Sequence, residues 1–260
     1  MIPSFWKEVI SEEEKTCCLT YVYDYSIKTT VQIPEEYEGY RVVKVDDEVW
    51  GKLMKAEHLI LPSGIERVGV YYPGNPEVKT VQIDDLHWYL TAGGIHHNRA
   101  LVNYYDLLLN GQPVREVVYP QDLTTVMPWQ FLGCASLESV VLHDGITEIG
   151  TLAFAITNLK RVVIPGSVKR IASEAFDCCD NLERLEIQEG VECLGGAFNF
   201  CDALKEVYLP SSICKVTDWE FTNCPSDLVI HIPNRAAFER IEFTRAEYKE
   251  EILQYAVFEE

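Results

Sequence analysis

The chain has 260 residues, and its contents of 47% hydrophobic and 24% charged residues are those of a globular protein. It carries 41 acidic and 22 basic residues, which gives a formal net charge of −19. Binding to nucleic acid or to an anionic membrane surface needs clustered lysine and arginine, so this charge argues against both. We therefore expect neither kind of partner.

No apolar run approaches the roughly 18 residues of a membrane-spanning helix, so the sequence predicts no membrane insertion. The N-terminal stretch MIPSFWKEVISEEEKTCC has neither a basic start nor a continuous apolar segment, and it does not resemble a signal peptide. We expect a cytoplasmic protein. The alternative is a secreted or cell-surface protein whose leader lies outside this sequence.

The predicted elements begin with residues 1–19, in which Phe5, Trp6, Val9 and Ile10 have the spacing of an amphipathic helix. Incomplete repeats follow. In VQIPEEYEGYRVVKV (31–45) and in AEHLILPSGIERV (56–68), an alternating apolar pattern typical of a strand ends at a proline.

Residues 84–113 interrupt the repeats as an irregular insertion. Within it, LLLNGQPV (107–114) predicts a strand, a turn at Asn110–Gly111 and a returning strand. His96 and His97 also lie in this insertion, but no third metal ligand stands at a suitable spacing, so we interpret them as loop residues.

From residue 114 the sequence repeats itself with a period of 22 or 23 residues. Each unit has an alternating apolar triplet, an apolar pair, an aromatic anchor and, three residues later, a small residue. The anchors are Phe131, Phe154, Phe176, Phe198 and Phe221. The small residues are Cys134, Thr157, Cys179, Cys201 and Cys224. The triplet predicts a short strand, and the anchor segment predicts one helical or 3₁₀ turn.

One such unit cannot fold alone. Its roughly six apolar side chains contribute about 1.5–3 kcal/mol each on burial, while ordering its backbone costs about 1–2 kcal/mol per residue. Stacked units share their inward faces, and the ends of such a stack must be covered. We interpret residues 1–19 as an N-terminal helical cap and residues 234–260, whose apolar residues have partly helical spacing, as a C-terminal helical cap.

The consensus LxxVxIPxxVxxIxxxAFxxCxxL resembles the repeat of the BspA-like leucine-rich repeat family of bacterial proteins. LKRVVIPGSVKRIASEAFDCCDNLERLEI (159–187) is a close match, and LLLNGQPVREVVYP (107–120) is similar to an insertion found in the family. The resemblance covers about residues 20–233. It implies an α/β repeat fold, a right-handed leucine-rich-repeat solenoid with a short strand and a short helical or 3₁₀ turn per coil, and a role in binding.

The nine cysteines are an odd number, form no C-x-x-C motif and do not stand at zinc spacings from the six histidines. We interpret them as reduced, small hydrophobic residues, among which a disulfide between Cys201 and Cys224 is conceivable in an oxidising compartment. No phosphate-binding loop or other catalytic motif is present. The sequence therefore predicts no metal site, no cofactor and no enzyme activity.

The outward positions of the predicted strands suggest a contact surface on the concave sheet of the solenoid. Three valines share one row, which is unusual for an open face, and arginine and tyrosine are favoured at binding hot spots. The candidate residues are Val118, Val141, Val163, Arg161, Arg184, Glu186, Tyr208 and His231. The valine row has two alternative causes: strand propensity favours valine here, or residues 84–113 cover the row.

We therefore predict a non-catalytic module that binds a protein partner. The alternatives are cell-surface adhesion to a host protein or glycan, which depends on the family resemblance, self-association through the valines or a sheet edge, and an enzyme with a site near 84–113. One local prediction concerns the repeat itself. Phe198 follows Leu194 by four residues where the other clear units have five, which predicts a tightened turn at Gly195–Gly196.

Overall fold

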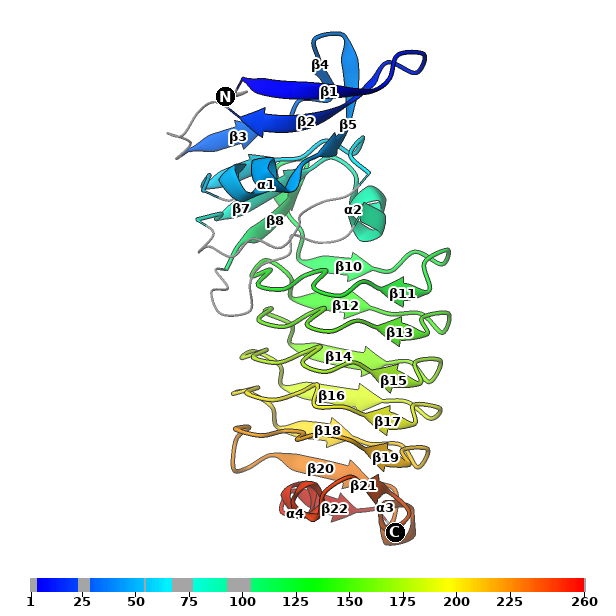
Figure 1. The fold of residues 1–260 in the computed structure, drawn as a ribbon. Helices are drawn as coiled ribbons and strands as arrows, with labels where there is room; N and C mark the ends of the chain where they lie inside the picture. Colours follow the sequence, from blue (N-terminus) through cyan, green and yellow to red (C-terminus); the bar gives the residue numbers. More distant parts are fainter. Residues whose placement is uncertain (1–3, 23–28, 54, 67–76, 93–103, 260) are drawn as a thin grey trace. The chain divides into compact units, whose positions relative to one another are not determined.

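The structure is a computed structural model that describes residues 4–22, 29–53, 55–66, 77–92 and 104–259 (Figure 1). Contacts between residues divide the chain into two compact units. The first comprises Met1–Val114 with Leu132–Ser136, and the second comprises Arg115–Phe131 with Leu137–Glu260. The predicted single body over residues 20–233 is thus divided near residue 114, and each unit is described by itself.

The first unit begins with a sheet of order β1-β2-β5-β4, formed by Phe5–Ser11, Thr16–Val22, Tyr40–Val45 and Glu36–Tyr37. β1 is antiparallel to β2, and β2 is parallel to β5. Helix α1, Asp47–Leu53, follows β5 and buries Val49, Trp50 and Leu53.

The predicted N-terminal helical cap over residues 1–19 is wrong, because this segment forms the hairpin of β1 and β2. Its aromatic and β-branched residues also suit a strand. β2 supplies a partner whose Cys17, Leu19 and Val22 are fully buried. β1 pairs with β2 across the hairpin, and β2 pairs with β5 on its other side; this pairing outweighs the helical spacing of β1.

A second sheet of the first unit has the order β3-β6-β7-β8-β9. Its strands are Thr30–Gln32, His58–Ile60, Thr80–Ile83, Asp106–Leu109 and Gln112–Pro113. β9 returns antiparallel to β8 across Asn110 and Gly111, whose φ angles are 50° and 81°, which confirms the predicted turn. Residues 84–113 are nevertheless not simply irregular: they contain α2, Leu86–Ala92, and β8 pairs in parallel with β7.

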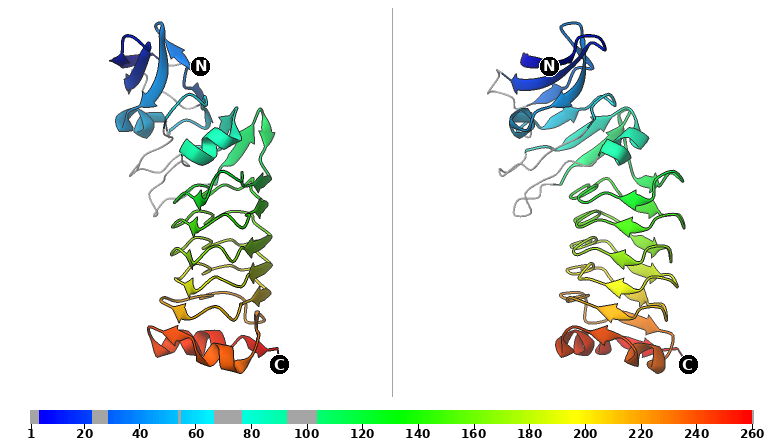
Figure 2. Two further views of the ribbon diagram at one scale, coloured as in Figure 1. Left: turned by 90° about the vertical axis from the view of Figure 1, so that its right-hand side faces the viewer. Right: turned by 45° about the vertical axis from the view of Figure 1, so that its right-hand side comes forward.

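The second unit consists of stacked coils, each with two short strands (Figures 1 and 2). The first strands are β10 Glu116–Val118, β12 Ser139–Val141, β14 Arg161–Ile164, β16 Arg184–Ile187, β18 Glu206–Tyr208, β20 Val229–Ile232 and β22 Ala256–Phe258. The second strands are β11 Thr125–Val126, β13 Glu148–Ile149, β15 Arg170–Ile171, β17 Cys193–Leu194, β19 Lys215–Val216 and β21 Glu242–Phe243. The second strands pair in parallel in one six-stranded sheet. The first strands pair in parallel in two sheets, β10-β12 and β14-β16-β18-β20-β22, with β14 in contact with β12; we call the two together the first-strand sheet.

The aromatic anchors form one continuous column inside the coils. Phe131, Phe154, Phe176, Phe198 and Phe221 are fully buried, and successive ring centroids lie 5.5, 5.1, 5.2 and 6.0 Å apart with nearly parallel planes. The column confirms the repeat register derived from the sequence.

Three of the small residues beside the anchors hydrogen-bond to the preceding coil. The thiols of Cys179, Cys201 and Cys224 donate to the carbonyl oxygens of Phe154, Phe176 and Phe198 at 3.2, 3.4 and 3.5 Å. Burial raises the pKa of the Cys179 thiol to about 12, so this thiol stays protonated and able to donate.

The predicted helical turn around each anchor is wrong: from residue 127 to 224 these segments are turns. Each of two regular coils has left-handed residues two positions before and two after its anchor, namely Leu152 and Ile156, then Glu174 and Cys178, with φ angles of 56–59°. A right-handed helix cannot pass through such residues. Three of their amides, those of Ile156, Glu174 and Cys178, donate to the next coil instead, for example from Cys178 to the Asn199 oxygen at 2.9 Å.

The C-terminal segment 234–260 is not a purely helical cap. It contains α3 Arg235–Glu239 and α4 Ala246–Leu253, but β21 extends the second-strand sheet and β22 extends the first-strand sheet. The last repeat leaves unpaired backbone groups on both sheets, and pairing with the tail satisfies them.

Candidate interaction surface

The outward face of the first-strand sheet in the second unit carries all eight predicted site residues. We call Val118, Val141 and Val163 the valine stripe; they stand on β10, β12 and β14 and expose 60%, 46% and 37% of their surface. Val118 is in register with Val141, and β14 is the neighbour of β12. Three apolar side chains thus lie side by side in solvent.

Arg161 is the cation available beside this stripe. It is exposed on β14, two residues before Val163, and its guanidinium group forms no ion pair or hydrogen bond with the described residues. Two nearby cations are already engaged, because Glu138 accepts from both Lys160 and Arg115. Both hydrogen bonds lower the pKa of the Glu138 carboxyl group, and the bond from Lys160 has the larger effect.

The other predicted residues form a different arrangement, which we call the arginine–tyrosine–histidine stack. Arg184, Tyr208 and His231 lie on β16, β18 and β20. The Arg184 guanidinium carbon lies 4.2 Å from the Tyr208 ring centroid, and the Tyr208 and His231 rings are parallel with centroids 4.3 Å apart. Tyr208 is therefore covered on both ring faces and offers a partner only its edge and hydroxyl.

Carboxylates at the edge of the stack pair with several of its polar atoms, whereas the buried Arg184 Nε has no hydrogen-bond partner among the described residues. Arg184 Nη1 donates to Glu206 Oε2 at 2.7 Å and to the Tyr208 hydroxyl at 3.2 Å, and His231 Nδ1 lies 3.1 Å from Glu259 Oε1. Glu186 is a weaker partner, because its Oε2 lies 4.0 Å from Arg184 Nη2. Burial opposes the charge of Arg184, but the bonds to Tyr208 and Glu206 outweigh it and raise its pKa.

The structure thus separates the eight residues into two groups. The valine stripe with Arg161 is open, whereas the stack satisfies most of its own hydrogen bonds. The sequence predicted the residues but not their pairing. That pairing could have been found, because Arg184 and Glu206, like Tyr208 and His231, occupy equal positions one repeat apart and are in register.

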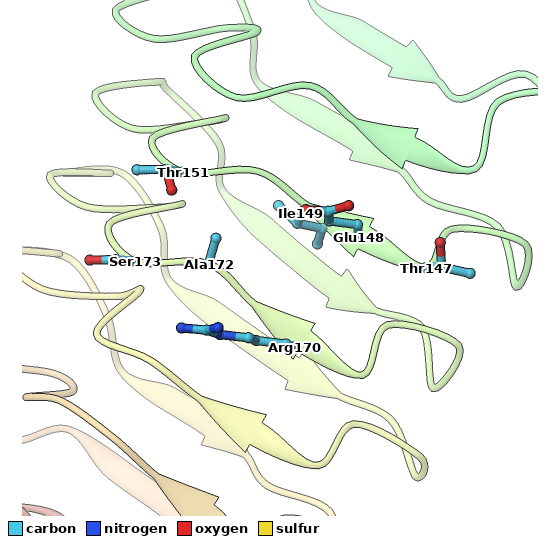
Figure 3. A pocket seen from close by; sticks show the side chains of 7 residues that line it. All are labelled: Thr147, Glu148, Ile149, Thr151, Arg170, Ala172 and Ser173. Carbon is cyan, nitrogen blue, oxygen red and sulfur yellow. The ribbon is translucent and has the colours of Figure 1, made fainter.

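A polar hollow of about 420 Å³ lies on the second-strand side of the coils and was not predicted (Figure 3). It is lined by Thr147, Glu148, Ile149, Thr151, Arg170, Ala172 and Ser173. Arg170 is in register with Glu148, but its guanidinium group points toward Ala172 and Ser173 (Figure 3). The hollow combines hydroxyl groups with one charge of each sign and has no nucleophile paired with a base.

The structure also bears on the residues considered for a catalytic or metal site. His96 and His97, named for a site near 84–113, lie outside the described residues. Among the residues that the structure describes, no three His, Cys, Asp or Glu side chains gather as metal ligands would. Within the same part of the chain, no helix has both the length and the apolar character needed to cross a membrane.

Residues 108–228 match the model of the BspA type leucine rich repeat region, in six copies. Comparison with curated proteins found no match. Similar solved structures include a leucine rich cell surface protein from Faecalibacterium prausnitzii, 18% identical, with a TM-score of 0.47 and coverage of 96% of this chain and 97% of the other. A leucine-rich repeat protein from Eubacterium ventriosum is 13% identical, with a TM-score of 0.40 and coverage of 95% and 91%.

Likeness to solved structures at this level carries no functional information. The matched range includes the coils from β10 to β19, whose register and anchors are described above. Residues 108–228 of the chain are therefore a leucine-rich repeat region of the BspA type.

Proposed function

We propose that the chain is a non-catalytic module that binds a protein partner on the outward face of its first-strand sheet. Leucine-rich repeat regions generally serve in protein interactions or at surfaces. The observation that carries the proposal is the valine stripe, three exposed apolar side chains on neighbouring strands with Arg161 beside them. Exposed apolar rows of this kind mark contact sites, because burying them on binding is favourable.

The chemistry of the stripe indicates what the partner presents. The three valines favour a partner that presents a row of apolar side chains with the spacing of paired strands, about 4.8 Å. Arg161 favours a carboxylate placed next to that row, because a guanidinium group binds a carboxylate through two parallel hydrogen bonds. The stack of Arg184, Tyr208 and His231 then acts as a polar rim, since its own contacts hold it in place.

The test begins with cross-linking in the native host to identify a candidate partner. The affinity of that partner is then measured for the purified chain and for the double variant Val141→Glu and Val163→Glu. We expect the variant to lose at least tenfold in affinity, because two carboxylates would face the partner's apolar row and repel its acidic group. Arg161→Ala should weaken binding less and reduce its dependence on salt.

A matched control is Met127→Glu, which changes an exposed apolar residue outside the valine stripe. Its affinity should equal that of the original chain. Unchanged affinity of the double valine variant, with an intact circular dichroism spectrum, would eliminate the proposed surface. Light scattering of the chain alone tests the alternative of self-association, which predicts a larger species that the valine substitutions dissociate.

A further inference from the structure

One coil of the second unit is a residue shorter than its neighbours. Four residues separate Leu194 from Phe198, whereas five separate Ile171 from Phe176 and Val216 from Phe221. The missing residue belongs to the turn between the second strand and the anchor. The stack continues through this coil without a break, because the ring of Phe198 lies 5.2 Å from that of Phe176 and 6.0 Å from that of Phe221.

The short coil lacks a hydrogen bond that three of the regular coils make. In those coils the amide just before the anchor closes a turn within its own coil, from Gln130 to Met127 at 3.3 Å, from Ala153 to Gly150 at 3.2 Å and from Ala175 to Ala172 at 3.3 Å. In the short coil the equivalent amide, that of Ala197, donates to Glu220 Oε2 at 3.1 Å. The Gly196 amide donates to Glu220 Oε1 at 2.5 Å.

Glu220 comes from the next coil, at the position where Ala153, Ala175 and Ala197 precede their anchors. It is 1% exposed. Gly196 has a φ of +75°, and a Cβ atom there would lie 3.1 Å from Asp218 Cβ and 3.2 Å from the Trp219 oxygen. Glycine therefore lets the two coils approach closely enough for the carboxyl group to reach both amides.

We propose that the carboxyl group of Glu220 replaces the missing residue of the preceding coil and makes the packing of these two coils depend on its protonation. This inference is independent of the proposed binding surface. It concerns a buried acid that bonds to the backbone of its neighbour, and a charge there must be held without water.

The surroundings of Glu220 set the sign of this dependence. Burial raises the pKa of Glu220 to about 8, against the opposing effect of the Ala197 and Gly196 amides, and the charges of Asp177 and Asp218 raise it further. The other groups nearby are Cys193 and Arg170, the latter placed over Gly195. At a pH between the ordinary pKa of 4.5 and the raised pKa of about 8, Glu220 keeps its proton in the folded chain and loses it in the unfolded chain. Stability therefore falls as the pH rises through this window, and the effect levels off above it.

The first test compares the full chain with Glu220→Gln by denaturant unfolding from pH 5 to 9; the glutamine does not titrate and keeps one acceptor oxygen for the two amides. For the original chain the unfolding constant should rise by up to about tenfold per pH unit relative to the variant, until about pH 8. Glu192→Gln serves as the control, because Glu192 is an exposed carboxylate of the short coil and the pH profile of this variant should follow that of the original chain. If the unfolding constants of the original chain and of Glu220→Gln change with pH in the same way, the proposal is overturned.

The second test repairs the coil and does not depend on the stability of Glu220→Gln. Insertion of one alanine between Gly195 and Gly196 restores the regular length, and Glu220→Ala restores the residue that regular coils have. Each change alone should destabilise the chain, whereas the two together should compensate and give a profile without the pH-dependent window. Strictly additive effects would show that Glu220 does not stand in for the missing residue.

Discussion

Residues at φ angles near +57° recur around every anchor in the regular coils, although most of them are not glycine. Leu152, Ile156 and Glu174 adopt this left-handed conformation, which costs an ordinary residue about 1–2 kcal/mol. The amides of Ile156 and Glu174 donate to the next coil at 2.9 and 2.6 Å. The bonds between coils and the buried anchors offset the strain, so each coil adopts its shape only when its neighbour is present.

The anchor column should respond to substitution far more strongly than an exposed aromatic residue nearby. Phe176→Ala removes a fully buried ring that stacks on two others, and we expect it to lower the free energy of unfolding by about 3–5 kcal/mol. Phe200→Ala is the matched control, since that ring is 48% exposed and should cost less than about 1 kcal/mol. Urea denaturation measures both values, and equal losses would contradict the role of the column.

The sequence predicted the anchors at this scale but not Glu220. An anchor is visible because its apolar side chain recurs at a fixed period. Glu220 interrupts the pattern of alanines before anchors, and in sequence it is indistinguishable from a solvated acid. The role of Glu220 becomes visible only when the lengths of the coils are compared and the structure shows its carboxyl group bonded to the shorter coil.

At the scale of elements, the turns between the two strands of a coil are positioned by contacts between backbones. Gly166 and Gly190 belong to neighbouring coils. A Cβ atom on Gly166 would lie 1.8 Å from the Glu189 oxygen, and one on Gly190 would lie 2.3 Å from the Gly166 oxygen. These turns therefore tolerate no side chain at either position without moving the backbone.

Gly166→Ala should accordingly destabilise the second unit, by about 1–3 kcal/mol, because it forces two packed turns apart. Gly64→Ala is the control: its Cβ atom would meet only the Val42 oxygen, at 3.8 Å, and it should be neutral or slightly stabilising. Thermal unfolding monitored by circular dichroism compares the two. A small effect of Gly166→Ala would mean that the two turns can separate without loss of stability.

Strands were predicted more reliably than helices. The alternating triplets form strands because their inward residues, such as Val162 and Ile164, are buried against neighbouring coils. The helical prediction failed at residues 1–19 because spacing of apolar residues cannot reveal a partner strand, and Thr16–Val22 supplies one. It failed around the anchors because left-handed residues lie on both sides of Phe154 and Phe176.

For the whole molecule, the C-terminal tail protects the end of both sheets of the second unit. β21 pairs with β19 and β22 pairs with β20, while Phe238 is buried against Phe243 and Phe258. An uncovered parallel sheet edge is a template for pairing with another chain. The tail therefore stabilises the unit and also limits association.

Deletion of residues 234–260 should convert the chain into an aggregating form, because it exposes two sheet edges and the apolar end of the core. Size-exclusion chromatography with light scattering should show large species in place of the original one. Deletion of residue 260 alone is the control, since it leaves β21, β22 and the contacts of Glu259 with β20 in place. A truncated chain that keeps the original size and stability would show that the repeats need no such cover.

The sequence alone determined the repeat, its register and the resemblance of this region to the BspA type repeat, because these follow from apolar residues that recur every 22 or 23 positions and must be buried together. It also named the residues of the outward face, since alternation assigns each strand position to one side.

Tertiary structure decided which of these residues are open to a partner. Arg184 is held by Glu206 and Tyr208, whereas Arg161 and the valines stay exposed, and such pairing depends on distances between coils. It also decided that the tail extends both sheets and that Glu220 completes the short coil, because contacts between segments outweigh local spacing when backbone groups would otherwise be left unpaired.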